Sequence, residues 1–324
     1  MIARWFATLA LTLAGLAGAT AQDWPTRPIT MVIPFAAGGP TDVLGRIMAE
    51  RMSQILGQQV IVENVGGAGG MTGAQRVATG APDGSSFVLG TVGTHAVNQT
   101  LYKRPLYDAA NDFKPVALIA EVPLILITRK DLGPNNLQEF ITQIKAKQKD
   151  MNFASAGNGS AVHLGCLLLN AALGTSVQHV PYRGSAPAMT DLQSGRVDFM
   201  CEIVSTALPQ IEGGTVKALA TLTKTRSPVL KDLPTADEQG MKDFEAYTWN
   251  AFFLPKATPD AIAKKLRDAT IEAMNSPAVK QRLEQLGATL VAPERTTPDY
   301  LAGFVRSEIT KWAAPIKASG VTIE

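Results

Sequence analysis

The chain has 324 residues, and its 30 basic and 28 acidic side chains give a formal net charge of +2 at pH 7. No block of basic residues follows the N-terminal segment, so the charge pattern argues against nucleic acid or an anionic membrane surface as a partner. The length is enough for two domains of roughly 100–200 residues each.

The N-terminus has the pattern of a cleavable export signal. Arg4 precedes an apolar stretch that runs to Leu16, and small residues ending at Ala21 provide a cleavage site. We therefore expect residues 1–21 to be a signal peptide and the mature chain to begin at Gln22 in the periplasm. No later stretch of the sequence offers the roughly 20 apolar residues of a membrane-spanning helix.

Residues 29–120 alternate short apolar runs with helical periods, which is typical of parallel sheets covered by helices. Between the first two runs, apolar side chains recur at helical spacing through residues 43–56. The alternation predicts an α/β fold. Strands are expected at residues 29–35, 60–63, 87–92 and 116–120.

The pattern begins again at Leu124 and predicts a second sheet with its own helices. Helices should begin near Asn136, Ser160 and Ser185, and Glu139 completes a capping box three residues after the first of these. Strands are expected at residues 124–128, 152–155, 177–182, 197–200 and 216–223.

The C-terminal part is predicted to be mostly helical. After a strand at residues 251–254, three helices should begin at Thr258-Pro259, Ser276-Pro277 and Thr297-Pro298, where a hydroxyl caps the helix and proline fills the first position. These helices have no sheet of their own nearby, so we expect them to cover the first domain.

This order of elements divides the mature chain into two domains. We expect the chain to cross between them twice, near residues 121–123 and near residues 245–248, and these crossings should form a hinge. The first domain comprises residues 22–121 plus 248–324, and the second comprises residues 122–247.

Two glycine-rich turns, at residues 34–42 and 154–160, each join a predicted strand to a predicted helix. A helix N-terminus exposes unpaired backbone N–H groups and about half a positive charge, so two such ends facing one cleft would bind an anion. We expect that anion to be a carboxylate. The candidate ligand-binding residues are Phe35, Ala36, Ala37, Gly38 and Gly39 in the first turn, and Ser155, Gly157, Asn158, Gly159 and Ser160 in the second.

A structural interpretation of both turns stays open. Glycines can simply make a tight strand-to-helix connection, and Asn158 or Ser160 can be a plain helix cap. Asp42, in the first helical turn, is expected to be a cap residue that pairs with Arg46 four residues later rather than with a ligand.

Two further groups follow predicted strands, where open α/β sheets place their ligand crevice. Thr91, Thr94 and His95 could donate to a carboxylate, although a lone histidine in a loop is more often a structural hydrogen-bonding group. Tyr182 and Arg183 follow another strand, and arginine can grip a carboxylate with two donors. A surface salt bridge is the competing interpretation of Arg183.

Two acidic residues, Asp198 and Glu202, stand around an apolar strand end. A carboxylate at such a position can orient an amine or a hydroxyl of a ligand, or it can pair with a neighbouring cation. We include Asp198 among the candidate ligand-binding residues.

Residues 66–73 form another glycine-rich segment after a strand, but the dinucleotide-binding spacing G-x-G-x-x-G fails at Thr72. The sequence contains no G-x-S-x-G or H-E-x-x-H motif, and its three histidines lack metal-ligand spacing. We therefore expect no cofactor, no metal and no catalytic activity.

Cys166 and Cys201 are the two cysteines of the chain, and both have apolar neighbours in the sequence. An oxidising compartment permits a disulfide, but the separation of the two residues cannot show one. We expect two buried thiols, since a free cysteine packs as a small hydrophobic residue.

Motifs are spread over the mature chain, at residues 24–29, 34–42, 66–73, 82–84, 157–164, 180–184 and 233–235. These motifs resemble those of the Bug family of periplasmic solute-binding proteins, the extracytoplasmic component of tripartite tricarboxylate transporters. Ser85 and Ser86 depart from the tyrosine and threonine usual in that family, and Asn64-Val65 replaces a common arginine-proline pair.

The resemblance implies a type II periplasmic binding protein fold, with two α/β domains joined by a two-strand hinge and a ligand cleft between them. In that fold the two glycine-rich turns would hold one carboxylate group, partly through ordered water, while less regular positions contact the rest of the solute.

The same resemblance implies a monomer that binds a small organic carboxylate and delivers it to the membrane subunits of a transporter. The alternatives are a protein that presents its ligand to a sensor kinase and, in a different class, a secreted α/β enzyme that acts on a carboxylic acid.

Overall fold

The computed structural model of the protein describes residues 24–318 and 320–323, so the expected signal peptide at residues 1–21 lies outside the described residues. The strands belong to one sheet of order β2-β1-β3-β9-β4-β7-β5-β6, with β8 and β10 also paired to β4. The strands are β1 (Ile29–Ile33), β2 (Val60–Asn64), β3 (Ser86–Thr91), β4 (Phe113–Arg129), β5 (Asn152–Ser155), β6 (Gln178–Pro181), β7 (Phe199–Ile203), β8 (Val216–Thr221), β9 (Tyr247–Pro255) and β10 (Thr289–Leu290).

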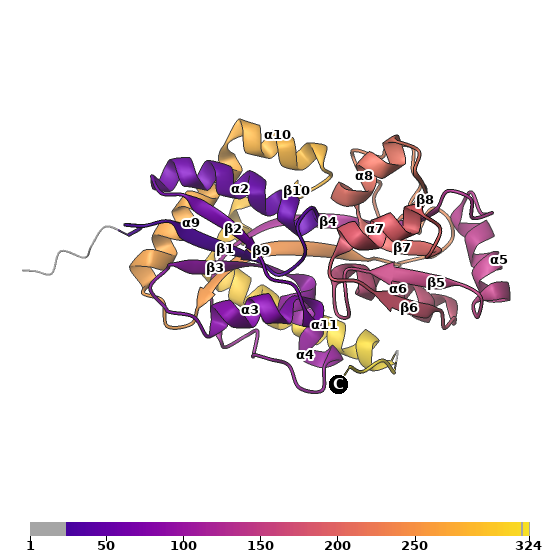
Figure 1. Cartoon of the computed structure of the whole chain (residues 1–324), viewed down its shortest axis with the longest axis horizontal. Coiled ribbons are helices and arrows are strands. Elements are labelled where there is room, and N and C mark those ends of the chain that lie inside the picture. Colours follow the sequence, from indigo (N-terminus) through magenta and orange to yellow (C-terminus); the bar gives the residue numbers. More distant parts are fainter. Residues whose placement is uncertain (1–23, 319, 324) are drawn as a thin grey trace, which may run out of the picture.

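Helices cover both faces of this sheet, so the predicted α/β class is confirmed (Figure 1). The longer helices are α2 (Pro40–Leu56), α3 (Met71–Ala78), α5 (Leu137–Lys147), α6 (Ala161–Leu173), α7 (Ser185–Gln193), α8 (Val204–Glu212), α9 (Asp260–Asn275), α10 (Pro277–Gln285) and α11 (Pro298–Ala318). The short ones are η2 (Ala68–Gly70), the π-helix η3 (Gly93–Val97), α4 (Asn98–Leu101) and η4 (Pro293–Thr296).

The strand β4 runs through the whole molecule (Figure 1). Its N-terminal part pairs antiparallel with β9, and its C-terminal part pairs antiparallel with β7 and β8. The prediction of two separate strands at residues 116–120 and 124–128 was therefore wrong. Pro123 interrupts the apolar pattern of the sequence, yet it takes a regular place opposite Tyr247 in the ladder.

The molecule consists of two lobes along β4. The first lobe contains β1–β3, α2–α4, the N-terminal part of β4 and the elements from β9 to α11, and the second lobe contains the C-terminal part of β4 and the elements from α5 to β8 (Figure 1). The two predicted crossings lie side by side, with Val122 opposite Thr248. Parallel pairing is confirmed within each lobe, between β1 and its neighbours and between β5 and its neighbours, but β4 and β9 make the sheet mixed.

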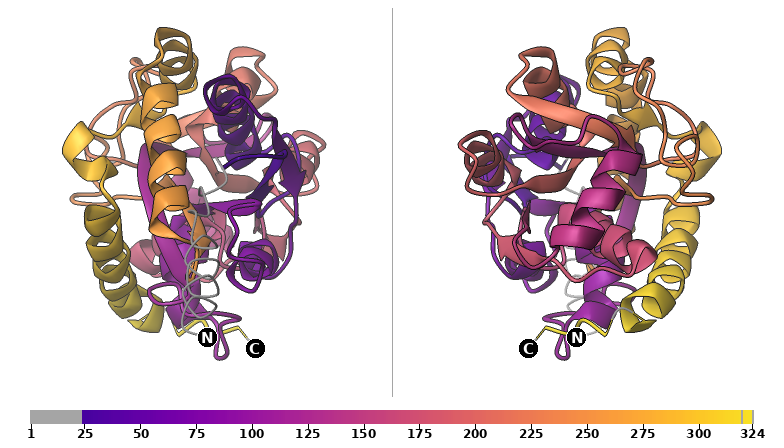
Figure 2. Two further views of the ribbon diagram at one scale, coloured as in Figure 1. Left: turned by 90° about the vertical axis from the view of Figure 1, so that its left-hand side faces the viewer. Right: turned by 90° about the vertical axis from the view of Figure 1, so that its right-hand side faces the viewer.

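The C-terminal helices return to the first lobe, as predicted. The helix α9 packs on α2, and α11 packs on η3, α4 and β4; in Figure 2, α11 runs along one side of the molecule in both views. Thr297 caps α11 by accepting a hydrogen bond from the Tyr300 amide (3.2 Å). Ser276 is the N-cap of α10 without a side-chain hydrogen bond, and α9 begins one residue later than expected, after Pro259.

Cys166 of α6 and Cys201 of β7 form a disulfide, so the expectation of free thiols was wrong. Both side chains are fully buried, and the bridge ties the helix α6 to the central strand of the second lobe. Among the described residues, no helix is both long and apolar enough to cross a membrane.

Candidate functional site

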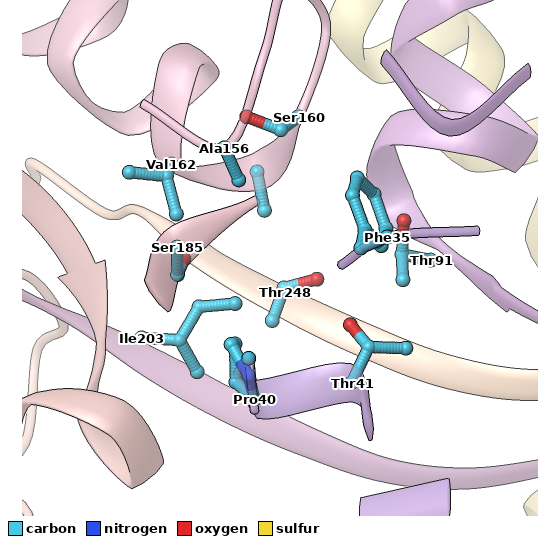
Figure 3. Close-up of a pocket in the computed structure, with 12 residues that line it drawn as sticks. Phe35, Pro40, Thr41, Thr91, Ala156, Ser160, Val162, Ser185, Ile203 and Thr248 are labelled. Atoms are coloured by element: carbon cyan, nitrogen blue, oxygen red, sulfur yellow. The ribbon is translucent and has the colours of Figure 1, made fainter. Parts of the chain in front are cut away.

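A narrow cavity lies between the two lobes. Figure 3 shows residues of the first lobe (Phe35, Thr41, Thr91) and of the second lobe on opposite sides, with Thr248 of β9 between them. The twelve lining residues are Phe35, Gly39, Pro40, Thr41, Thr91, Ala156, Ser160, Ala161, Val162, Ser185, Ile203 and Thr248.

The first-lobe side of the cavity is the N-terminus of α2. Gly39 is the N-cap with extended backbone angles, and Pro40 occupies the first helical position. Gly38 has a positive φ of 80°, which a glycine adopts without strain. The turn therefore brings the first amides of α2 to the cavity wall, although proline itself contributes no N–H.

This turn carries its own anion, the buried carboxylate of Asp42. Its Oδ2 accepts hydrogen bonds from the Gly38 amide and Arg46 Nε (2.9 Å each), and its Oδ1 accepts one from Asn64 (2.9 Å). Burial alone would raise the pKa of Asp42, but these hydrogen bonds outweigh it and lower the pKa below its usual value. The predicted Asp42–Arg46 pair is confirmed, and the Gly38 amide is used within the turn.

The N-terminus of α6 forms the opposite wall. Ser160 is the N-cap, and its hydroxyl accepts a hydrogen bond from the His163 amide (3.2 Å). This cap satisfies the third amide of the helix and leaves those of Ala161 and Val162, which both line the cavity. The turn before the helix depends on the positive φ angles of Gly157 (114°) and Gly159 (79°).

Two stacked imidazoles support this second turn from behind. The rings of His163 and His179 lie 4.2 Å apart between centroids. Their hydrogen bonds are with the turn: the Gly159 amide donates to His163 Nδ1, and His179 Nε2 lies 2.7 Å from Ser155 Oγ. Burial lowers the pKa of His163 to about 3 and that of His179 to about 4. Both rings are therefore neutral at pH 7.

A third helix N-terminus, that of α7, also reaches the cavity. Gly184 is its N-cap, and Ser185 is its first residue. The Ser185 hydroxyl donates a hydrogen bond to Glu202 Oε1 (3.0 Å), a carboxyl group that is fully buried behind the cavity wall. Ile203, next to Glu202, lines the cavity just before α8 begins.

The cavity is therefore surrounded by helix N-termini from both lobes. Each contributes unpaired amides and a partial positive charge, and one such contact stabilises an anion by about 0.3–1 kcal/mol when exposed and up to ~2 kcal/mol when partly buried. No lysine or arginine is among the described residues of the lining. A negative charge placed here would depend on main-chain dipoles and on the hydroxyls of the lining, which belong to Thr41, Thr91, Ser160, Ser185 and Thr248.

A larger groove adjoins the cavity and shares Ala156 with it. Asn158, Tyr182 and Arg183 line it from the second lobe, and Tyr102 and residues 67–70 line it from the first. Arg183 is exposed, so this groove offers the positive side chain that the lining of the cavity lacks.

The lobes touch each other around these spaces. The Ala36 amide donates to the Arg183 carbonyl oxygen (3.3 Å), and the Tyr102 hydroxyl donates to the Asn158 carbonyl oxygen (3.0 Å). Both hydrogen bonds join the first lobe to the second, so the structure is that of a closed form.

Glycines allow the closest approaches between the lobes. A Cβ atom at Gly69 would overlap the carbonyl oxygen of Asn158, and one at Gly93 would overlap that of Gly159. The glycine-rich segment at residues 66–73, which lacks dinucleotide-binding spacing, thus forms a contact surface for the second lobe.

The candidate residues fall into three groups. Those that line the cavity are Phe35, Gly39, Thr91 and Ser160, and those that line the groove are Gly157, Asn158, Tyr182 and Arg183. The remaining candidates, Ala36, Ala37, Gly38, Thr94, His95, Ser155, Gly159 and Asp198, line neither space.

Two of these outlying residues have clear structural roles. His95 is fully buried, and its ring stacks on Phe253 at 3.9 Å between centroids. Asp198 stands at the other end of β7 from Ile203, where it accepts hydrogen bonds from Arg129 Nε (3.0 Å) and the Asn152 amide (2.8 Å). Neither side chain is available to a ligand in the cavity.

Several residues of the cavity wall were not among the candidates predicted from the sequence. Ser185 follows Tyr182-Arg183-Gly184 in the same order of strand, glycine and helix as the two turns that were recognised, and that order was a usable signal. Thr41 lies within the recognised turn at residues 34–42 and carried the same signal. Thr248 carries no such signal, because only the folded chain brings β9 to the cavity.

The family model described as tripartite tricarboxylate transporter family receptor matches residues 44–321. Protein BugT of Bordetella pertussis is 35% identical over 316 residues, which cover 97% of this chain and 96% of that protein. The solved structure of the periplasmic binding protein BugD aligns with a TM-score of 0.90 at 40% identity, covering 93% of this chain and 100% of that one. MatC from Rhodopseudomonas palustris, solved with bound malate, aligns with a TM-score of 0.88 at 40% identity, covering 90% and 100%.

Proposed function

The chain belongs to the tripartite tricarboxylate transporter receptor family, which includes the Bug proteins, and we propose that it captures a small organic carboxylate in the cavity between its lobes. The observation that carries this proposal is the convergence of the α2, α6 and α7 N-termini on one cavity whose described lining has no basic side chain. Such a site attracts an anion through backbone amides.

The lining of the cavity supports an oxygen-rich ligand group. Thr248 presents a buried hydroxyl without a hydrogen-bond partner among the described residues, and a carboxylate oxygen would satisfy it. The related MatC was solved with malate, which belongs to this chemical class.

The exposed Arg183 extends the proposal to the distal part of the solute. A second acidic group that reaches from the cavity into the groove would meet the guanidinium, which is shaped for two parallel hydrogen bonds to a carboxylate. We therefore favour a dicarboxylate over a monocarboxylate.

Binding and release follow from motion of the lobes. In the proposed cycle the domains at residues 22–121 plus 248–324 and at residues 122–247 open about β4 and β9, admit the acid, and close again through the Ala36–Arg183 and Tyr102–Asn158 hydrogen bonds. The loaded, extracytoplasmic monomer then meets the membrane subunits of a transporter, while presentation to a sensor kinase would use the same closed form.

The role proposed here is non-catalytic. Ser155 and His179 are the one serine–histidine pair hydrogen-bonded through side chains among the described residues, but Ser155 is fully buried and its hydroxyl also contacts the Gly157 carbonyl oxygen (3.2 Å). A nucleophile needs access to its substrate, so this pair serves the turn.

Native mass spectrometry of the purified protein, followed by calorimetry with mono-, di- and tricarboxylates, tests the function. We expect one acid to bind, to be released unchanged, and to lose at least tenfold in affinity when one carboxylate is replaced by an amide, about 1.4 kcal/mol. Equal binding of the neutral analogue would refute the carboxylate site, and turnover of the acid would identify an enzyme.

A further inference from the structure

Glu202 is an acidic residue that is fully buried directly behind the cavity wall. It lies on β7, is 0% exposed, and its Oε1 accepts hydrogen bonds from the Ser185 hydroxyl (3.0 Å) and the Ile203 amide (2.7 Å). Both donors belong to residues that line the cavity. The carboxyl group is therefore one hydrogen bond away from the proposed ligand site.

Within the part of the chain that the structure describes, no basic side chain contributes to the electrostatic environment of this carboxyl group. The elements packed against β7 are β4, β5, α6, α7 and α8. In the second lobe their charged side chains are Arg129, Asp191 and Glu212, each near the end of its element that is remote from the cavity, while β5 has none. The imidazole of His163 on α6 is neutral at pH 7, as is that of His179 beyond it, because burial lowers the pKa of both rings.

The hydrogen bonds of Glu202 are divided unequally between its two oxygens. Oε1 has two donors, whereas Oε2 is buried and has no partner among the described residues. An ionised carboxylate would leave a charged oxygen without a donor, which is costly in a buried site. Burial raises the pKa of Glu202 to about 7, although the hydrogen bonds from Ile203 and Ser185 oppose the shift.

An anionic ligand would increase this preference for the neutral form. The described lining of the cavity has no basic side chain, so a bound carboxylate and an ionised Glu202 would repel each other across the buried residues Ser185 and Ile203. Binding the anion and protonating Glu202 therefore favour one another, as any two linked equilibria do.

We propose that Glu202 is a proton-linked positioning residue, so that capture of a carboxylate in the cavity is accompanied by protonation of this buried side chain. The inference rests on the proposed function, because it requires an anion in the cavity. The neutral acid keeps Oε1 as the acceptor of the Ser185 hydroxyl and adds an O–H donor on Oε2. Loading is consequently favoured by acidity and release by alkalinity.

The linkage predicts the direction and size of the pH effect. At pH 6 Glu202 is already protonated, so binding takes up almost no proton. Above the pKa of the ligand-free protein, each loaded molecule takes up nearly one proton, and affinity falls by up to tenfold per pH unit until the pKa of the loaded protein is reached.

The test combines calorimetry with infrared spectroscopy on wild type and Glu202→Gln, which keeps the Oε1 acceptor. Malate, adipate and citrate are titrated between pH 6 and 8.5 in buffers of different ionisation enthalpy, which reports the protons taken up. Glu212→Gln, an exposed acid at the end of α8, is the matched control. Infrared spectra of the ligand-free proteins report the carbonyl band of a protonated carboxylic acid.

Wild type and the Glu212→Gln control should show the band at pH 6, lose it by pH 8.5, and take up close to one proton per acid bound at pH 8. Glu202→Gln should lack the band, take up no proton, and bind equally well across the range. Tight binding without proton uptake, or a missing band in wild type at pH 6, would overturn the inference while leaving the carboxylate function intact. Failure of every acid to bind would overturn both.

Discussion

The two glycine-rich turns reach the same cavity in different electrostatic states. In the first lobe, the first turn of α2 contains the Asp42 carboxylate, which takes the Gly38 amide and pairs with Arg46. In the second lobe, the first turns of α6 and α7 contain no acidic residue, and α6 is capped by the neutral hydroxyl of Ser160. The partial positive charge at the N-terminus of α2 is thus partly neutralised by Asp42, whereas those at the N-termini of α6 and α7 are not.

This difference predicts that the two lobes contribute unequally to the binding of an anion. A carboxylate of the protein at a helix N-terminus accepts hydrogen bonds from amides and offsets the partial positive charge that would otherwise attract an anionic ligand. We therefore expect the second lobe to contribute most of the binding free energy of the acid. The first lobe, with its glycine contacts, then closes over an acid that is already docked. The disulfide adds to this division, because it fixes α6, the main binding helix, to β7.

Removing the disulfide should cause the largest loss of unfolding free energy, and the loss should be confined to the second lobe. The double variant Cys166→Ala/Cys201→Ala should lose about 3 kcal/mol of unfolding free energy, within the range typical of native disulfides. Urea denaturation followed by circular dichroism measures the loss, and hydrogen exchange locates it. An equal loss of hydrogen-exchange protection at amides of the first lobe and of α6 would contradict a local stabilising effect of the disulfide.

Acid should weaken the second turn before the first. The folded pKa of His179, about 4, lies below the ordinary value of 6.5, so the unfolded chain binds more protons and stability falls as the pH drops from 6.5 towards 4. The folded pKa of Asp42 is also lowered, but from 3.8, so its contribution is lost only at more acidic pH.

The variant His179→Gln should therefore flatten the acid side of the stability profile. At pH 4 the wild type should have lost about 2 kcal/mol more than the variant, relative to pH 7, after allowance for partial exposure of the ring. Urea midpoints at half-unit pH intervals provide the measurement. Parallel profiles for the two proteins would show that the imidazole is not held neutral by the fold.

A substitution at Gly93 tests closure of the two lobes separately from binding of the acid to the second lobe. An alanine there keeps an acceptable helical residue in η3 but places a methyl group against the Gly159 carbonyl oxygen. Overpacking of this kind costs about 2 kcal/mol, so acid affinity should fall roughly 30-fold while the melting temperature changes little.

The matched control is Gly303→Ala on α11, where nothing lies within 4 Å of the added methyl group. Calorimetry compares the two variants, and small-angle scattering compares their compaction with the acid present. Full compaction and full affinity of Gly93→Ala would show that the lobes close differently from this structure.

Single substitutions can remove a free amide from the first turn of α6 or add one to the first turn of α2. Ala161→Pro removes one free amide from α6 at a position where proline fits, since Ser160 before it is extended (φ −69°, ψ 160°). A hydrogen bond to a charged group contributes about 1.5 kcal/mol or more, so affinity should fall roughly tenfold. Pro40→Ala, which adds an amide to α2, should change affinity by at most a few-fold. Equal effects of the two substitutions would contradict the unequal roles of the lobes.

Much of the fold was predictable because the signals are local. The strand before the first glycine-rich turn is a short, largely apolar run. The caps at Asn136, Ser160 and Thr297 follow from hydroxyl or amide side chains that precede a helix. The continuity of β4 was not predictable in this way. Pro123 looks like a break in the sequence, and only pairing with β9 shows otherwise.

The site was predictable only in part, for the same reason. The two turns could be recognised because strand, glycine and helix follow one another in the sequence. The structural roles of His95 and Asp198, and the place of Thr248 in the cavity, depend on contacts between distant segments. The pairing of Cys166 with Cys201 likewise depends on α6 lying across β7.

A crystal structure of the loaded protein tests the central claim most directly. We predict one carboxylate group in the cavity, with its oxygens within hydrogen-bonding distance of main-chain amides of α2 and of α6 or α7, directly or through one water molecule. An acid held only by Arg183 in the outer groove, with the cavity between the helix ends empty, would contradict the account.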